Sequence, residues 1–249
     1  MVQVILYHGI KVIQKTVLQR GKIDIMKTIF IDFEMNPIQS KFKDARRICK
    51  NEIIEIGAVL LGDDFKEIAS FKQYVKPEFN EIADRYSRLT GITNQHVQNA
   101  PCFEDAVLEL LCWCETKCMD DVFIIYAWSD NDLKQLENEM KLKNVEIEVF
   151  INLMDNWRDF QREYCDLLGL EKIISLECAL NSIGENFVGR MHDALWDARN
   201  TASIFALSKN EEQFNRIMQP IIEALRPSKP MTYCLGEIFK GKIEGFSAA

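Results

Sequence analysis

Two carboxylates at the end of an apolar run constrain this chain more than any other feature. The run Thr28-Ile-Phe-Ile-Asp32 has the composition of a buried strand, and Glu34 follows two residues later. Because side chains alternate between the two faces of a strand, Asp32 and Glu34 are expected on the same side. Neighbouring carboxylates repel each other, and burying them unpaired is costly. Cations that prefer oxygen ligands, such as Mg²⁺ or Mn²⁺, relieve that cost, so the pair predicts a metal site.

Two later segments carry the other groups of the predicted site. Asp132 follows a second apolar run, residues 122–128, and precedes Leu133 and Leu136, which would anchor a helix on the sheet. Asp130 also follows this run and is placed to cap the same helix, so it is the competing candidate. Asp132 is preferred because a side chain in the first helical turn could lean back toward the strand ends.

His192 and Asp197 form the last part of the pattern. Five residues on a regular helix separate two side chains by about 140° around the axis, so the two cannot share one face. His192 is therefore expected on the loop or first turn after Gly189, with Asp197 on the helix. An imidazole changes charge near neutral pH and can accept a proton from water. Four carboxylates and one imidazole in this order are the layout expected of a two-metal nuclease.

The remaining pattern predicts a mixed α/β domain, with a five-stranded central sheet flanked by helices. Strands are expected at residues 28–34, 52–61, 67–75, 122–128 and 148–153. Helices are expected at about 81–89, 103–118, 131–141, 155–167, 176–183 and 192–208. Ser175 is predicted to cap the helix at 176–183, and Gly184 to end it.

The two ends of the chain are expected to lie outside this domain, which spans residues 27–210. Residues 1–26 are basic and are interpreted as an extension upstream of Met26, with an extra strand or helix, or a basic arm, as the alternatives. Residues 211–249 are expected to form a C-terminal helix and an irregular tail. No apolar run is long enough to span a bilayer.

Composition narrows the class of partner and the compartment. The net charge of −8 disfavours broad binding to duplex nucleic acid, but not a substrate held by metal ions. Eight scattered cysteines lack paired zinc-ligand spacing and are interpreted as structural thiols. Without a secretory leader, a reducing cytoplasm is the expected location.

These motifs resemble the DEDDh branch of the DnaQ-like 3′–5′ exonucleases, which have an RNase H-like fold. The resemblance runs from about Lys27 to Ser208 and is strongest to the KapD-like and Eri-type group of exoribonucleases. It is carried by Asp32-x-Glu34, Asp132, His192-x4-Asp197, and the segment Leu89-Thr-Gly-Ile-Thr93 followed by Val97 and Asn99-Ala-Pro101. Asp130 is an extra acid that many relatives lack, so the second-motif acid could be either Asp130 or Asp132.

The resemblance implies a role for each matching residue. It places Asp32, Glu34 and Asp197 around one divalent cation, with Asp32 shared and Asp132 holding a second cation through water. It makes His192 the general base. It also implies that the backbone at Phe33 and the Leu89–Thr90 turn hold the 3′-terminal nucleoside, with Met35 near the terminal base.

The expected function is a Mg²⁺- or Mn²⁺-dependent exonuclease that acts from the 3′ end of single-stranded nucleic acid. RNA is favoured over DNA, and nucleoside 5′-monophosphates are the expected products. The alternatives are a regulatory binding module on a retired nuclease scaffold and a proofreading subunit bound to a polymerase. A retired site would be expected to lose an acid or the histidine, and this chain has all five groups. No membrane association is expected, and the sequence indicates no particular protein partner.

Overall fold

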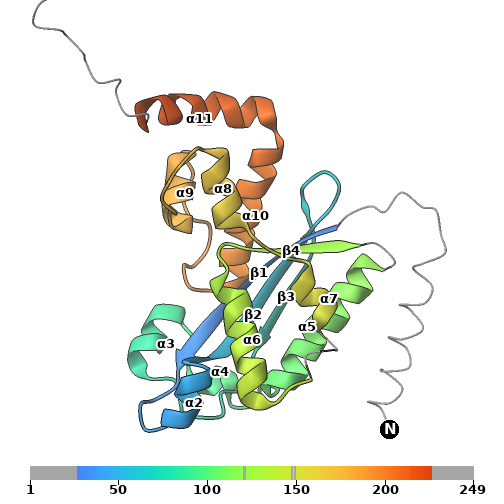
Figure 1. Cartoon of the computed structure of the whole chain (residues 1–249), viewed down its shortest axis with the longest axis vertical. Coiled ribbons are helices and arrows are strands. Elements are labelled where there is room, and N and C mark those ends of the chain that lie inside the picture. The colour runs from blue at the N-terminus through green and yellow to red at the C-terminus, as the bar shows by residue number, and fades with distance from the viewer. Residues whose placement is uncertain (1–26, 120–121, 147, 149, 226–249) are drawn as a thin grey trace, which may run out of the picture.

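A mixed sheet with strand order β3-β2-β1-β4-β5 forms the centre of the protein. The structure is a computed structural model, and it describes residues 27–119, 122–146, 148 and 150–225. The expectations for residues 1–26 and for the tail after residue 225 therefore lie outside the described residues. The mixed α/β class and the five-stranded sheet predicted from the sequence are confirmed, with four of the strands at the expected positions (Figure 1).

Three strands form an antiparallel meander, and two more are parallel to the first of them. The meander consists of β1 (Lys27–Pro37), β2 (Asn51–Leu61) and β3 (Glu67–Tyr74). The parallel strands are β4 (Phe123–Ala127), beside β1, and β5 (Trp157–Asp159), at the edge. The turn at Asp63-Asp64 joins β2 to β3 as a hairpin.

The helices cover both faces of this sheet (Figure 1). Their bounds are α2 Lys43–Ile48, α3 Asp84–Thr90, α4 Asn94–Val97, α5 Phe103–Cys118, α6 Asn131–Lys143, α7 Ile151–Asp155, α8 Phe160–Leu167, α9 Leu176–Ser182, α10 Ala194–Lys209 and α11 Glu211–Leu225. None of the helices in the described residues combines the length and the apolar character needed to cross a membrane. Ser175 caps α9 by accepting a hydrogen bond from the Cys178 N–H, and Gly184 follows the helix end with φ +78°, as predicted.

The expected strand at 148–153 is wrong. Residues Ile151–Asp155 form α7. Its N-cap Phe150 and Leu153, three positions apart, are both buried, as on one side of a helical turn. The fifth strand lies at Trp157–Asp159, within the segment predicted to start a helix, and that helix, α8, begins at Phe160. A short apolar run does not distinguish helix from strand by its periodicity, and a three-residue edge strand has almost none to detect.

Strand β1 separates two hydrophobic clusters. Ile29, Ile31 and Phe33 belong to the cluster that includes α5 and α6, whereas Phe30 belongs to the one that includes α8 and α10. This alternation sends the side chains of even-numbered β1 residues toward α10. Asp32 and Glu34 continue that even-numbered set, so the local rule that builds the core also directs both carboxylates toward α10.

Gly57 lets α10 approach the sheet. Gly57 lies opposite Asp32 in the β1–β2 register. A Cβ atom on Gly57 would be 2.2 Å from the Ala194 carbonyl carbon and from the Leu195 nitrogen, both in the first turn of α10. The helix backbone thus lies against the strand where a side chain would otherwise be, and Asp197 is carried toward Asp32.

Substitution Gly57→Ala is expected to push α10 away and to lower the free energy of unfolding by about 1–3 kcal/mol or more, the range for overpacked cores. Thermal and urea unfolding would measure the loss. The matched control is Gly62→Ala in the β2–β3 connection, where the added methyl meets the Ile68 side chain at 3.0 Å rather than helix backbone. Equal stability of the two variants would contradict this account of how α10 packs.

Candidate active site

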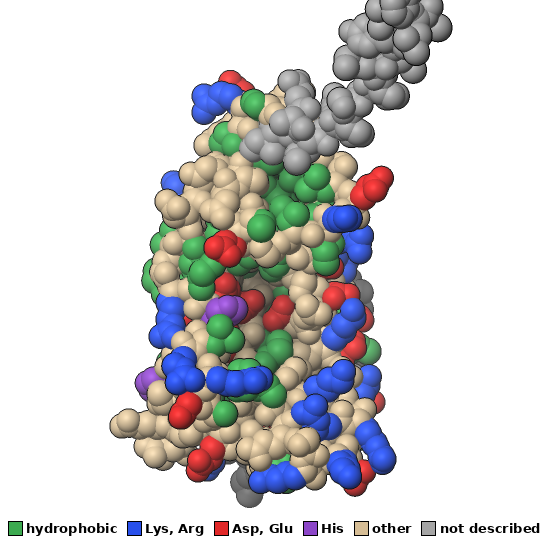
Figure 2. Space-filling model, turned by 90° about the vertical axis from the view of Figure 1, so that its left-hand side faces the viewer, with side chains coloured by type: hydrophobic (Ala, Val, Ile, Leu, Met, Phe, Trp, Pro, Cys, Tyr) green, Lys and Arg blue, Asp and Glu red, His purple; other side chains and the backbone are tan. Residues whose placement is uncertain are grey.

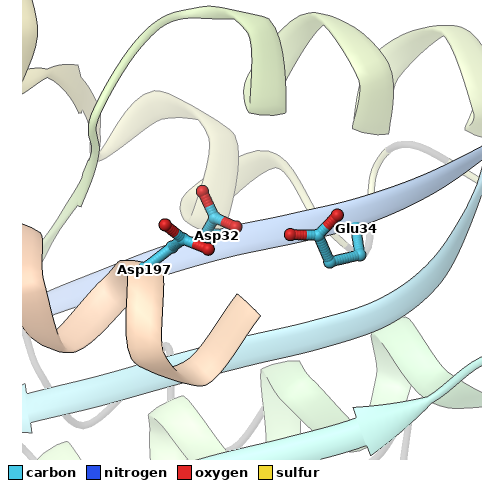
Figure 3. A group of neighbouring side chains, drawn as sticks. All are labelled: Asp32, Glu34 and Asp197. Atoms are coloured by element: carbon cyan, nitrogen blue, oxygen red, sulfur yellow. The ribbon is translucent and has the colours of Figure 1, made fainter. Parts of the chain in front are cut away.

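Three carboxylates meet where β1 passes the first turn of α10. Asp32 and Glu34 come from the strand and Asp197 from the helix, and one oxygen of each lies within 4.8 Å of the others (Figure 3). The carboxylate of Glu34 points toward the other two in this view. Residues 165 positions apart in the chain are thereby combined into one donor set, which sequence analysis expected for these three residues.

Burial gives this cluster unusual proton affinity. The loss of hydration raises the pKa of Asp32 well above its usual value, and the negative charges of Asp132 and Asp197 raise it further. Burial, and then the charge of Asp197, raise the pKa of Glu34 to about 8. Burial raises the pKa of Asp197 to about 7 against the opposing effect of hydrogen bonds from the backbone of Asp193 and His192. The cluster is therefore strained when fully ionised.

The donor set fits divalent cations. Carboxylate oxygens are the ligands that Mg²⁺ and Mn²⁺ prefer. Oδ2 of Asp197 is buried and has no hydrogen-bond partner among the described residues, although buried oxygens normally have one. A cation beside this oxygen would supply the missing partner and offset the mutual repulsion of the three carboxylates.

The structure distinguishes Asp132 from Asp130. Asp132 is buried, with 6% of its surface exposed, and its Oδ1 accepts a hydrogen bond from the Phe33 N–H at 3.2 Å. It thus contacts the backbone between Asp32 and Glu34, outside the group of three but near enough to raise the pKa of Asp32. Asp130 is half-exposed and pairs with Lys134, one turn along the surface of α6. The geometry favours Asp132 as the second-motif acid.

His192 lies in the turn that precedes α10, as expected from its spacing. It is exposed and has φ +60°, a left-handed conformation that is uncommon for a residue with a Cβ. Asp193 follows as the N-cap of α10 and accepts a hydrogen bond from the Trp196 N–H. Figure 2 shows acidic side chains gathered in a hollow of one face, with a histidine side chain at its edge.

The turn that carries His192 is fastened on both sides. The side-chain amide of Asn200 accepts a hydrogen bond from the Val188 N–H at 3.0 Å and donates one to the Val188 carbonyl at 2.9 Å. The guanidinium of Arg190 donates to the carbonyl of Arg88 at 3.1 Å and lies directly over Gly91. The turn before α10 is therefore tied both to its own helix and to the end of α3.

A buried carboxylate that the sequence analysis missed holds the start of α10. Glu55 lies opposite Glu34, and its Oε2 accepts a hydrogen bond from the Ala194 N–H at 2.9 Å. Lys72 on β3 joins the arrangement, with its Nζ 3.0 Å from Glu55 Oε1 and 2.6 Å from Asp193 Oδ2. The available signal was a lone acid inside the apolar run Ile53-Ile-Glu-Ile, a position that requires a partner when buried.

The four residues expected to hold a nucleoside differ in how far their side chains are exposed. The ring of Phe33 packs against Trp157 in the core, so only its backbone can face the site. Thr90 is buried, and its hydroxyl donates to the Tyr86 carbonyl and accepts from the Ile92 N–H, which closes the turn after α3. Leu89 is 48% exposed and Met35 is half-buried. Of the four side chains, Leu89 offers the largest accessible apolar surface.

Comparison with known proteins identifies the family. The chain belongs to the RNase T-type exonuclease family, whose model, described as "Exonuclease", matches residues 29–205. It is 32% identical over 195 residues to human "ERI1 exoribonuclease 2", a match that covers 70% of this chain and 27% of the relative. It is 28% identical over 160 residues to mouse "3′-5′ exoribonuclease 1", covering 62% of this chain and 46% of the relative. The chain thus spans less than half the length of these relatives.

Solved structures show the same fold. The nuclease domain of 3′hExo, described as a DEDDh family member bound to rAMP, aligns with a TM-score of 0.64 at 24% identity, over 74% of this chain and 92% of that domain. The cell-death related nuclease CRN-4 aligns with a TM-score of 0.60 at 21% identity, over 74% of this chain and 64% of the other. The five-stranded sheet flanked by helices is therefore the RNase H-like exonuclease fold expected from the sequence. Divalent metal ions are a property of this family, and the acidic cluster of this chain fits them.

The raised pKa values predict how stability depends on pH and cations. In the unfolded chain these carboxylates ionise near pH 4, whereas in the folded protein Asp132 and Asp197 ionise near pH 7 and Glu34 near pH 8. The folded state thus holds more protons between these limits. The cation-free protein should therefore lose stability as pH rises from about 4 to about 8.

Added Mg²⁺ or Mn²⁺ should reverse that loss, and the rise in Tm should be larger at pH 8 than at pH 6. At a hundredfold excess over Kd the rise should reach roughly 5–10 °C for a chain of this size. Differential scanning fluorimetry after chelation measures both effects. Asp32→Asn should abolish the cation-induced rise while making the cation-free protein more stable at pH 8. A cation-induced rise that persists in this variant would place the cation elsewhere.

Proposed function

We propose that this chain is a metal-dependent 3′–5′ exonuclease, which hydrolyses phosphodiester bonds from the 3′ end of single-stranded nucleic acid and releases nucleoside 5′-monophosphates. The observation that carries the proposal is the convergence of Asp32, Glu34 and Asp197, from two distant segments, within a family of exonucleases. The turn bearing His192 leads directly into the helix that supplies Asp197.

The carboxylates would hold two divalent cations, Mg²⁺ or Mn²⁺. Asp32, Glu34 and Asp197 would bind one, and Asp32 with Asp132 the other. When bound, such a pair neutralises charge at the scissile phosphate and activates the attacking water. Asp132 has a second effect through the protein, since its hydrogen bond to the Phe33 N–H fixes the backbone between the two β1 carboxylates.

His192 would act as the general base by accepting the proton of the attacking water at an imidazole nitrogen. Its exposed position allows it to move toward the cluster and return the proton to solvent. The hydrogen bonds of Asn200 and Arg190 and the ion pair of Asp193 hold the backbone on both sides of it. These contacts restrict the backbone positions from which the imidazole can approach the cluster, while the side chain stays exposed.

RNA is the favoured substrate class. The two curated relatives compared above are named as exoribonucleases, and the 3′hExo nuclease domain is described as bound to rAMP. Exposed Leu89 offers the apolar surface that a terminal base needs. One observation favours the polymerase-associated alternative, a 31% identity over 161 residues to a PolC-type DNA polymerase III of Thermotoga petrophila, which covers 10% of that protein. Labelled RNA and DNA oligomers of one sequence, degraded side by side, would decide between the two.

Asp32→Ala and Asp132→Asn are expected to reduce cation-dependent release of 3′ nucleotides from a 5′-labelled oligomer to the rate seen with chelator. Each substitution removes an oxygen donor at the centre of the proposed site. Asp130→Asn is the matched control, two residues from Asp132 but on the surface, and should retain activity to within about twofold. Full activity of Asp32→Ala would refute the site, and loss of activity in Asp130→Asn alone would reassign the second motif.

His192→Ala is expected to lower kcat by about 10²–10⁴-fold, the usual effect of losing a general acid or base. The cation-induced rise in Tm should be retained, because the imidazole is not among the proposed ligands. His96→Ala is the control, since His96 stacks on Tyr74 and caps α4. A variant without His192 that turns over at the wild-type rate would assign proton transfer to another group.

A further inference from the structure

A short basic segment stands out in a chain of net charge −8. Residues 41–50 contain five Lys or Arg and a single acid, Asp44. The four most exposed of these cations are Lys41, Lys43, Arg47 and Lys50, which lie on α2 and its flanks and are called the α2 ridge below. The fifth, Arg46, is half-buried and donates to the Ile38 carbonyl after β1, which gives it a structural role.

The positive charges of the α2 ridge are largely not neutralised by neighbouring carboxylates of the described residues. Lys41, Lys43 and Lys50 form no ion pair with any carboxylate among the described residues, although acids outnumber bases in the chain as a whole. Arg47 pairs only with Asp44 at 3.0 Å, and both side chains are almost fully exposed. An exposed pair of this kind contributes little and exchanges readily for another anion.

Aromatic side chains lie within the same surface. Phe42 packs edge-on against Phe79 with ring centroids 5.4 Å apart, and both residues are half-buried. The ammonium group of Lys41 lies 4.9 Å from the centre of the Phe42 ring. Cations that follow a sugar–phosphate backbone, together with aromatic rings that can stack on bases, are the combination that binds single-stranded nucleic acid.

The α2 ridge is rigidly connected to the proposed active site. It follows β1, which carries Asp32 and Glu34, and its far end is tied to α6, the helix of Asp132, by the Gln135 side chain, which donates to the Asn51 carbonyl at 2.9 Å. Figure 1 places α2 beside α6, at the end of the molecule toward which β1 runs. Figure 2 shows Lys and Arg side chains gathered on that part of the face, below the acidic hollow.

We propose that the α2 ridge binds the phosphates of single-stranded nucleic acid on the 5′ side of the terminal nucleotide, an inference that rests on the proposed exonuclease function. The acidic cluster repels a polyanion until cations fill it, and the protein as a whole is negative. Binding of a strand therefore needs a separate positive surface. The α2 ridge supplies one on the face that bears the acidic hollow, and it would direct the 3′ end toward that hollow.

The test compares two sets of three substitutions. The ridge variant is Lys41→Gln with Lys43→Gln and Lys50→Gln. The control variant is Lys117→Gln with Lys172→Gln and Arg216→Gln, which removes three exposed cations from other parts of the surface. The substrates are a labelled single-stranded RNA of roughly twelve nucleotides, long enough to reach from the acidic hollow to the α2 ridge, and a dinucleotide that can fill only the acidic hollow.

We expect the ridge variant to raise KM for the long substrate by about tenfold or more, with kcat unchanged and the dinucleotide cleaved normally. The slope of log KM against log salt should fall by about 2, from three lost phosphate contacts on a single strand. The control variant should resemble the wild type. Equal effects on both substrates, or none on the long one, would overturn the proposal.

A binding measurement separates this proposal from the proposed function. Fluorescence anisotropy of the labelled RNA in chelator requires no catalysis, so it reports on the α2 ridge even if the wild type cleaves nothing. Weaker binding by the ridge variant than by the control variant supports the α2 ridge in either case. Equal binding by the two variants overturns it, whereas a wild type that binds but does not cleave refutes the exonuclease function alone.

Discussion

The repulsion between carboxylates crowded into a partly buried cluster is the constraint on which this structure depends. Asp32 and Glu34 are directed to one face by the alternation of β1, and Asp197 is brought to them by a helix that needs a glycine on the neighbouring strand to come close. Burial then raises the pKa of all three, and the cluster can stay folded by keeping protons. Divalent cations can replace those protons, so the unfavourable arrangement is also what would give the site affinity for metal.

The surroundings of the cluster show how the fold maintains such an arrangement. Glu55 is a fourth acid on the same face of the sheet, but its oxygens are bound to the Ala194 N–H and to Lys72. It therefore positions α10 instead of offering a free ligand. Lys72 extends the same contact to Asp193. Glu55 thus fixes the helix that brings Asp197 to Asp32 and Glu34, which separates this structural carboxylate from the proposed ligands.

The sequence predicted the parts of the site that follow local rules. Strand alternation gave the shared face of Asp32 and Glu34, and the helix at 103–118 was found with the bounds expected from its apolar spacing. The short elements were missed: α2 has six residues and no side-chain cap at its start, and β5 has three residues. The contact between Lys72 and Asp193 joins residues 121 positions apart and has no local pattern. Such contacts depend on the strand register and on how closely a helix packs on the sheet. Many residues together determine both, so no local pattern predicts them.

The hydrogen bond from Arg190 to the end of α3 has a wider consequence. It joins the end of α3, which carries Leu89, to the turn that carries His192, although the two are about a hundred residues apart in the chain. A ligand that displaces Leu89 would therefore also displace the turn that carries the imidazole. Under the proposed function, specificity and proton transfer would thus be coupled, because a mutation near Leu89 that admits a different sugar or base would also shift the turn that carries His192.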